Sequence, residues 1–113
     1  MPTGRKLRDN ERDLIAAMLK RTPHDELIDR LNACCVEDML DGGMGSIRFT
    51  DESGAERRLG EAIAEADYID EDGVLVSIVL NTDTSGRLYE VDFWKVDFSP
   101  LRRYPSPSDV LVK

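Results

Sequence analysis

Two stretches in the second half of the chain alternate apolar and polar residues with the period of a β-strand. Residues 74–81 read VLVSIVLN, and a polar turn, TDTSGR, separates them from LYEVDFWKVDFSPL at 88–101. Successive strand residues point to opposite faces, so this pattern predicts a β-hairpin. Both faces of 74–81 are largely apolar, which favours a central position in a sheet. We expect the rest of the chain to pack on this hairpin.

The apolar phase changes within the second strand of the hairpin. Val91 and Phe93 fall on one face, whereas Trp94, Val96 and Phe98 fall on the other. A β-bulge near Phe93 and Trp94 would bring both sets to the core, and without a bulge one set stays outside as a patch. Because large aromatic side chains are usually mostly buried, we expect Trp94 in the core.

The first third of the chain has helical spacing instead. Asn10 is expected to cap a first helix, and Thr22 followed by Pro23 predicts the start of a second. The apolar stripe of the first helix is Leu14, Ile15, Met18 and Leu19, and that of the second is Leu27, Ile28, Leu31, Cys34 and Cys35.

Between the helices and the hairpin we expect up to three strands, at 36–40, 46–50 and 61–70. The last of these segments fits either a helix face or strand alternation, and we choose a strand because it runs into the turn sequence DEDG at 70–73. A further turn is expected at 51–54. The predicted fold is α+β, with two N-terminal helices packed on a four- or five-stranded antiparallel sheet. Residues 1–113 form a single domain, in which 100–113 is an extended Pro-containing tail whose 110–112 segment docks on a sheet edge.

Composition narrows the protein class. The chain has 113 residues, 41% hydrophobic and 34% charged, which fits one globular domain. It contains no apolar run of the roughly 20 residues that a membrane helix needs, and its charged N-terminus does not resemble a signal peptide. Cys34 and Cys35 are adjacent, a spacing that rarely closes a disulfide. We therefore expect a reduced cytoplasmic protein without membrane contact.

The net charge of -8 is concentrated in the middle of the chain, where residues 34–99 carry five Lys/Arg against sixteen Asp/Glu. Nucleic acid is not expected as a partner, because phosphate binding needs clustered Lys and Arg. A basic protein or a cation suits this body better. The acidity also has a simpler explanation, since it keeps a small protein soluble.

Two acidic clusters are weak candidates for metal ligands. The spacing of Asn81, Asp83, Ser85 and Asp92 resembles a calcium loop, but the first position is Asn and the flanks are strands. A plain hairpin turn explains the same residues, so we expect no cofactor. The second cluster, which includes Asp70, Glu71 and Asp72, could bind a cation or a partner, and a solvated turn is the simpler interpretation. With His24 as the only histidine, no conventional catalytic triad can be built, and we expect no enzyme.

A contact surface is the alternative to a buried Trp94. If the bulge is absent, aromatic and basic side chains of the kind found in binding hot spots gather near the end of the hairpin: Trp94, Lys95, Arg102, Arg103 and Tyr104. With the bulge, Trp94 enters the core and the two arginines are merely solvated.

Parts of the sequence resemble a known family. The segments RxLxxxE at 5–11, DxDGV at 70–74 and LYEVDFWKVDFSPL at 88–101 resemble an uncharacterised family of small bacterial proteins, a resemblance that covers most of the chain and implies no activity. In size, acidity and fold class the chain is also loosely similar to bacterial immunity proteins. The leading hypothesis is a protein-binding module, inhibitor-like or immunity-like, that uses its acidic sheet against a basic partner. The alternatives are a self-associating structural module that forms homo-oligomers, and a small metal-binding protein or enzyme.

Overall fold

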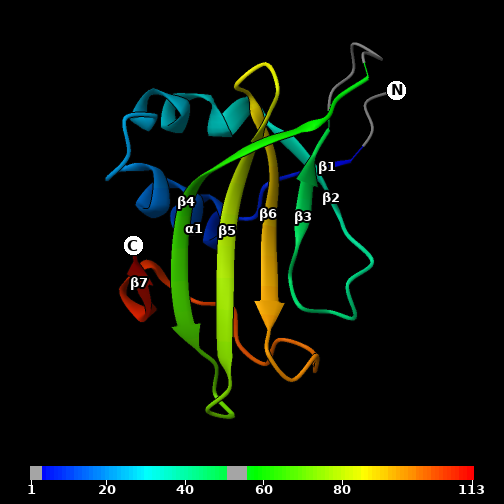
Figure 1. Ribbon diagram of the computed structural model, residues 1–113, viewed down its shortest axis with the longest axis vertical. Coiled ribbons are helices and arrows are strands. Elements are labelled where there is room, and N and C mark those ends of the chain that lie inside the picture. Colours follow the sequence, from blue (N-terminus) through cyan, green and yellow to red (C-terminus); the bar gives the residue numbers. More distant parts are fainter. Residues whose placement is uncertain (1–3, 51–55) are drawn as a thin grey trace.

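The predicted hairpin lies at the centre of a seven-stranded antiparallel sheet in the computed structural model (Figure 1). The structure describes residues 4–50 and 56–113, so the turn expected at 51–54 lies outside the described residues. The elements in chain order are β1 (Arg5–Lys6), α1 (Asp9–Leu19), the 3-10 helix η1 (Asp25–Ala33), β2 (Cys35–Asp38), β3 (Ile47–Phe49), β4 (Leu59–Ile69), β5 (Leu75–Asp83), β6 (Leu88–Lys95), the short 3-10 helix η2 (Pro107–Asp109) and β7 (Val110–Val112). Their order across the sheet is β1-β2-β3-β6-β5-β4-β7.

The α+β class is therefore confirmed, but the predicted sheet of four or five strands was too small. The five predicted strand segments correspond to β2 to β6. The two additional strands, β1 and β7, have two and three residues and pair at opposite edges of the sheet. Segments this short contain no complete alternation, so they give no period for sequence analysis to detect.

The core lies between one face of the sheet and the two N-terminal helices. Val76, Ile78 and Leu80 of β5 are fully buried, and Ile78 is opposite Phe93 of β6. The expected stripe of α1 is also fully buried, and α1 lies behind β4 and β5 in the view of Figure 1. The opposite sheet face, which neither helix covers, is called the open face below.

The segment whose pattern fitted both helix and strand is a strand. β4 pairs with β5 from Leu59 to Ile69 and with β7 over Ala66 to Tyr68. Tertiary pairing on both sides overrides the helical propensity of its Ala and Glu residues. The docking of 110–112 on a sheet edge is confirmed by the same pairing.

Both helices begin differently from the prediction. The N-cap of α1 is Arg8, not Asn10. The Arg8 backbone N–H donates a hydrogen bond to the Glu11 carboxylate at 2.8 Å, and Arg5 donates two more to the same carboxylate. The Thr22 hydroxyl accepts the His24 backbone N–H, but the helix that follows is a 3-10 helix from Asp25.

The cysteines do not extend the second helix either. Cys34 is already extended, with φ -82 and ψ 143, and Cys35 opens β2. No helix within residues 4–50 and 56–113 is long and apolar enough to cross a membrane.

The C-terminal segment is extended but well anchored. The Leu101 N–H donates to the Gly43 carbonyl, and the Tyr68 hydroxyl donates to the Arg103 carbonyl at 2.9 Å. The Tyr104 ring packs against Phe93 with centroids 5.5 Å apart. These contacts place residues 100–105 across the lower end of the sheet.

Candidate binding surface

The expected bulge in β6 is absent, and this leaves Trp94 outside the core. The pairing of β5 with β6 runs without interruption from Val76–Lys95 to Asn81–Glu90, and its single irregularity lies beyond Asn81. Trp94 is 52% exposed, so the expectation that it is buried was wrong. The change of apolar phase within β6 therefore places Trp94, and the apolar residues that follow it, on the open face.

Five exposed apolar side chains gather at the lower end of the open face and are called the apolar patch: Ile69, Leu75, Trp94, Val96 and Phe98. Cross-strand pairs place them together. Ile69 is opposite Leu75, and Trp94 is opposite Ser77, two residues further along β5. Large contiguous apolar surfaces are uncommon on soluble monomers and mark interaction sites.

The centre of the apolar patch is an aromatic pair with an unusual backbone. The Trp94 and Phe98 rings meet edge to face, with centroids 5.0 Å apart. Phe98 has φ 65, the left-handed region that bulky residues rarely adopt. Because this conformation costs free energy and holds an exposed ring over Trp94, it points to a role in contact.

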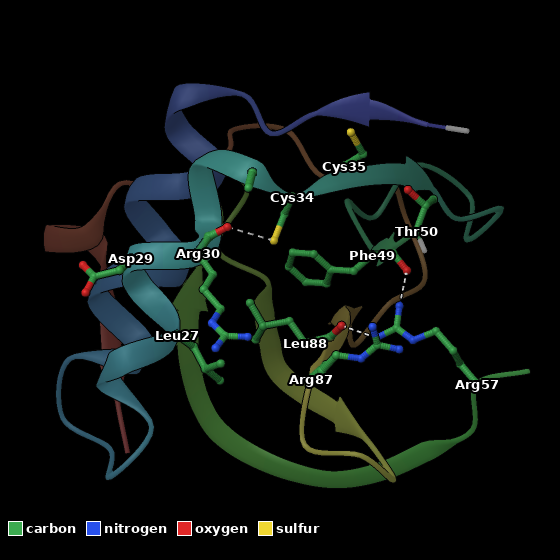
Figure 2. A pocket seen from close by; sticks show the side chains of 11 residues that line it. Leu27, Asp29, Arg30, Cys34, Cys35, Phe49, Thr50, Arg57, Arg87 and Leu88 are labelled. Carbon is green, nitrogen blue, oxygen red and sulfur yellow. Dashed lines mark hydrogen bonds between the residues drawn. The ribbon is translucent and has the colours of Figure 1, made fainter. Parts of the chain in front are cut away.

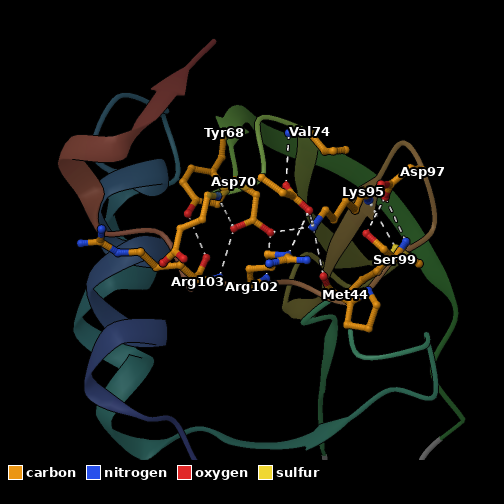
Figure 3. A network of polar contacts seen from close by, with 12 residues as sticks. Met44, Tyr68, Asp70, Val74, Lys95, Asp97, Ser99, Arg102 and Arg103 are labelled. Carbon is orange, nitrogen blue, oxygen red and sulfur yellow. Dashed lines mark hydrogen bonds and ion pairs between the residues drawn. The ribbon is translucent and has the colours of Figure 1, made fainter.

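Lys95, the residue after Trp94, points to the core side of β6 and belongs to a buried ion-pair network (Figure 3). The Lys95 ammonium is fully buried and donates to Asp70 at 2.9 Å, to Asp72 at 2.6 Å and to the Pro100 carbonyl at 3.1 Å. Asp70 in turn accepts backbone N–H groups of Arg102 and Arg103 at 2.8 and 3.1 Å. The network ties the β4–β5 turn to the end of β6 and to the C-terminal segment.

These contacts fix the charge states of the network. Burial acts to raise the pKa of Asp70, but the backbone N–H of Arg102 and the Lys95 ammonium outweigh it and lower the value to about 2. Burial likewise acts to lower the pKa of Lys95, and the hydrogen bonds to Asp72 and Asp70 raise it above its ordinary value. Both groups therefore stay ionised at neutral pH, and the turn is held rigidly beside the apolar patch.

The sequence-predicted binding residues are divided between this network and the surface. Asp70 and Asp72 belong to the network, so the solvated turn expected at this place is instead an internal ion pair, and Glu71 alone of the three carboxylates is free of it. The side chains of Arg102 and Arg103 are exposed, and Tyr104 packs on the core side against Phe93. Lys95 differs most from the prediction, because it was expected at the surface and is fully buried.

The residues of the calcium-like spacing do not converge on one point. One Asp83 oxygen accepts the N–H groups of Ser85 and Arg87, and the other pairs with Arg57 at 2.9 Å. The Asn81 amide instead donates to Asp92 at 2.7 Å. Within the described residues, no group of three or more His, Cys, Asp or Glu side chains is arranged to hold a metal ion.

A comparison with protein-family models matches residues 4–105 to a domain of unknown function, DUF6984. The chain belongs to the DUF6984 family. The resemblance to an uncharacterised family is thereby confirmed. No curated protein and no solved structure matches the chain, so the loose similarity to immunity proteins stays a hypothesis.

Sequence reasoning missed two members of the patch in this DUF6984 chain. Ile69 and Leu75 point outward from β4 and β5, next to the turn that joins the two strands. A single apolar residue at such a position does not by itself indicate a surface patch. Their signal is the pairing register, since the DxDGV turn brings them opposite each other across the hairpin. That register becomes visible only when the turn geometry is known.

Proposed function

We propose that this protein is a binding module whose apolar patch docks a basic protein. The single observation that carries the proposal is the exposed Trp94–Phe98 pair, held over a rigid turn on an otherwise uncovered sheet face. Aromatic side chains with a preorganised support are the usual anchors of protein interfaces.

The charge around the apolar patch supports a basic partner. Along the open face, the paired strands carry Glu65, Asp67, Glu90 and Asp92 in the outward phase. Arg48 and Lys113 balance part of this charge, through Glu90 at 2.6 Å and Asp67 at 3.4 Å. The remaining acidity adds to a net charge of -8, which would accelerate association with a basic surface and select against acidic ones.

The same charge argues against a second copy as the occupant of the patch. Two open faces brought together would place like charges opposite one another, and like-charge contacts across an interface are costly. A partner with basic residues around an apolar centre satisfies both parts of the surface. If a second copy nevertheless occupied the patch, the protein would self-associate, and the experiment below includes light scattering to detect this.

The test uses two variants of the aromatic pair and one distant control. Trp94→Ser removes the anchor, and Phe98→Gly removes the ring while fitting the left-handed backbone, so that the fold is retained. Arg21→Gln is the control, because it changes the charge at an exposed position in the turn after α1. Each chain is immobilised, exposed to lysate of the native host and washed with increasing salt, and retained proteins are identified and then re-purified for titration.

The expected result is a basic protein retained by the wild type and by Arg21→Gln. For that purified protein the affinity should fall at least about tenfold with Trp94→Ser or Phe98→Gly, as for an interface hot spot. Its binding should also weaken as salt rises. A retained protein that binds all four chains equally, or light scattering that shows a dimer dissolved by Trp94→Ser, would contradict the proposal.

A further inference from the structure

Two carboxylic acids lie side by side on the open face, next to the apolar patch. Glu90 and Asp92 are two residues apart on β6, so both point to the same face, and Trp94 is the next residue of this row. Glu90 is buried and Asp92 is half-buried. The two carboxyl groups share a hydrogen bond, which requires a proton on one of them. Gain or loss of that proton therefore changes the charge at the edge of the apolar patch.

The two acids differ in the partners that surround them. The Nε and Nη2 atoms of Arg48, on β3, lie 3.0 and 2.6 Å from one Glu90 oxygen. Asp92 instead receives the neutral amide of Asn81, on β5, at 2.7 Å. The arginine therefore favours the ionised form of Glu90 first, and Asp92 is the member of the pair that is more easily protonated.

The neighbouring strands add little positive charge around Asp92. Arg57 lies further toward the upper end of the sheet, at the wall of a separate cavity (Figure 2), and its guanidinium pairs there with Asp83 at 2.9 Å. Across β5, the residue opposite Asp92 is Val79, and the residue of β4 opposite Val79 is another acid, Glu65.

Burial and the charge of Glu90 both favour the protonated form of Asp92. Burial is the larger cause, and together they raise the pKa of Asp92 from 3.8 to about 6, against the opposing effects of Asn81 and Arg48. Above pH 6 a negative charge lies beside Trp94, and below pH 6 the same position is neutral.

From this geometry we infer that a proton on the Glu90–Asp92 pair regulates the apolar patch, which holds its basic partner when Asp92 is ionised and releases it when Asp92 is protonated. The inference rests on the proposed protein-binding function. A cation of the partner beside Asp92 would stabilise the ionised form, so binding and protonation oppose each other reciprocally. A contact of this kind is worth about tenfold in affinity. Linkage then makes binding to the wild type about fivefold weaker at pH 5 than at pH 8.

The experiment measures the affinity of a synthetic peptide, KKLFLKK, at pH 8 and pH 5 and constant ionic strength. The peptide carries lysines around an apolar centre, as proposed for the partner, and its binding is followed by the fluorescence anisotropy of a tetramethylrhodamine label. Asp92→Asn keeps an oxygen for the Asn81 amide but is uncharged at both pH values. Asp29→Asn is the matched control, because it removes an exposed carboxylate from η1, on the helix-covered side of the sheet. Trp94→Ser tests whether the peptide uses the apolar patch.

A second measurement needs no peptide. The carbon-13 shift of the Asp92 carboxyl group, followed by NMR as the pH is changed, reports the protonation of this residue directly. The midpoint should lie near pH 6 in the free protein and move to lower pH when the peptide is bound.

The wild type and Asp29→Asn should both bind the peptide about fivefold more weakly at pH 5 than at pH 8. Asp92→Asn should bind it about tenfold more weakly than the wild type at pH 8, with less than about a twofold change between the two pH values. Binding that depends on Trp94 but is equal at both pH values, or an Asp92 carboxyl that titrates near pH 3.8, would overturn this inference alone. Absence of binding, or equal binding by Trp94→Ser, would count against the proposed function as well.

Discussion

Replacing Asp70 with asparagine tests the buried network that supports the apolar patch. The change keeps the size of the side chain and one carbonyl oxygen but removes the negative charge. In the wild type, the Asp70 carboxylate receives the Lys95 ammonium and three backbone N–H groups, from Glu71, Arg102 and Arg103. Asparagine leaves a fully buried ammonium with Asp72 as its remaining carboxylate.

The expected loss of stability can be estimated in two ways. The folded protein lowers the pKa of Asp70 from 3.8 to about 2, and this difference corresponds to about 2.5 kcal/mol in favour of the charged form. Removing one partner from a buried ion pair usually costs about 3–5 kcal/mol. We therefore expect Asp70→Asn to lower the free energy of unfolding by about 3 kcal/mol, a large part of the 5–15 kcal/mol typical of a domain.

Urea denaturation followed by far-UV circular dichroism measures this loss, and a thermal scan should show the melting temperature falling by roughly 10–15 °C. Asp97→Asn is the matched control. The Asp97 carboxylate is exposed and accepts hydrogen bonds from Ser99 just after β6, so its replacement should leave the melting temperature almost unchanged. A loss below about 1 kcal/mol for Asp70→Asn, as for a surface ion pair, would refute the reasoning.

The same network predicts a pH dependence. Because the folded pKa of Asp70 is below its ordinary value, its contribution is complete above pH 3.8 and is lost as the pH falls toward 2. The wild type should therefore lose stability over this window, and Asp70→Asn should lose less. Parallel curves for the two proteins would show that Asp70 is not the group that titrates.

Three further predictions concern other parts of the fold. Burial raises the pKa of Asp92 to about 6, so the contribution of Asp92 to stability is fully present below pH 3.8 and is lost as the pH rises through 6. After allowance for solvent screening, Asp92→Asn should gain about 1 kcal/mol relative to the wild type at pH 8 and nothing at pH 3, as measured by thermal scans at both pH values. Gly60→Ala would place its Cβ against the Asp83 carbonyl and should cost about 1–3 kcal/mol in urea denaturation, whereas an unchanged midpoint would mean that β4 can shift. Glu11→Gln removes the negative charge and one of the two oxygens that accept hydrogen bonds from Arg5 at the start of α1, and it should cost about 2 kcal/mol by the same assay. A neutral result would show that the ion pair is dispensable.

The central part of the fold could be predicted because its signals are local. The hairpin and the apolar stripe of α1 follow from periodicity alone. The pairing of β5 with β6 confirms the hairpin, and the stripe is fully buried. What failed depends on side-chain pairs and strand pairing that an apolar pattern does not contain. The cap of α1 is set by Glu11, which pairs with Arg5, and the short strand β1 exists because β2 pairs with it. The cavity lined by Arg30, Arg57 and Arg87 likewise joins three separate segments and has no sequence motif.

The position of Trp94 shows most clearly where pattern reasoning goes wrong. Counting apolar side chains as inward required a bulge, because it assigned Trp94 to the core and Lys95 to solvent. The register does the opposite: Lys95 pairs with buried Val76, and its charge is matched by Asp70 and Asp72 of the turn that precedes β5. Lys95 can thus point inward because Asp70 and Asp72 of the β4–β5 turn neutralise its charge. Once Lys95 points inward, strict alternation forces Trp94 to point outward. The buried ion pair is therefore the physical reason that the aromatic surface exists, and any change that returns Lys95 to solvent should also remove the surface.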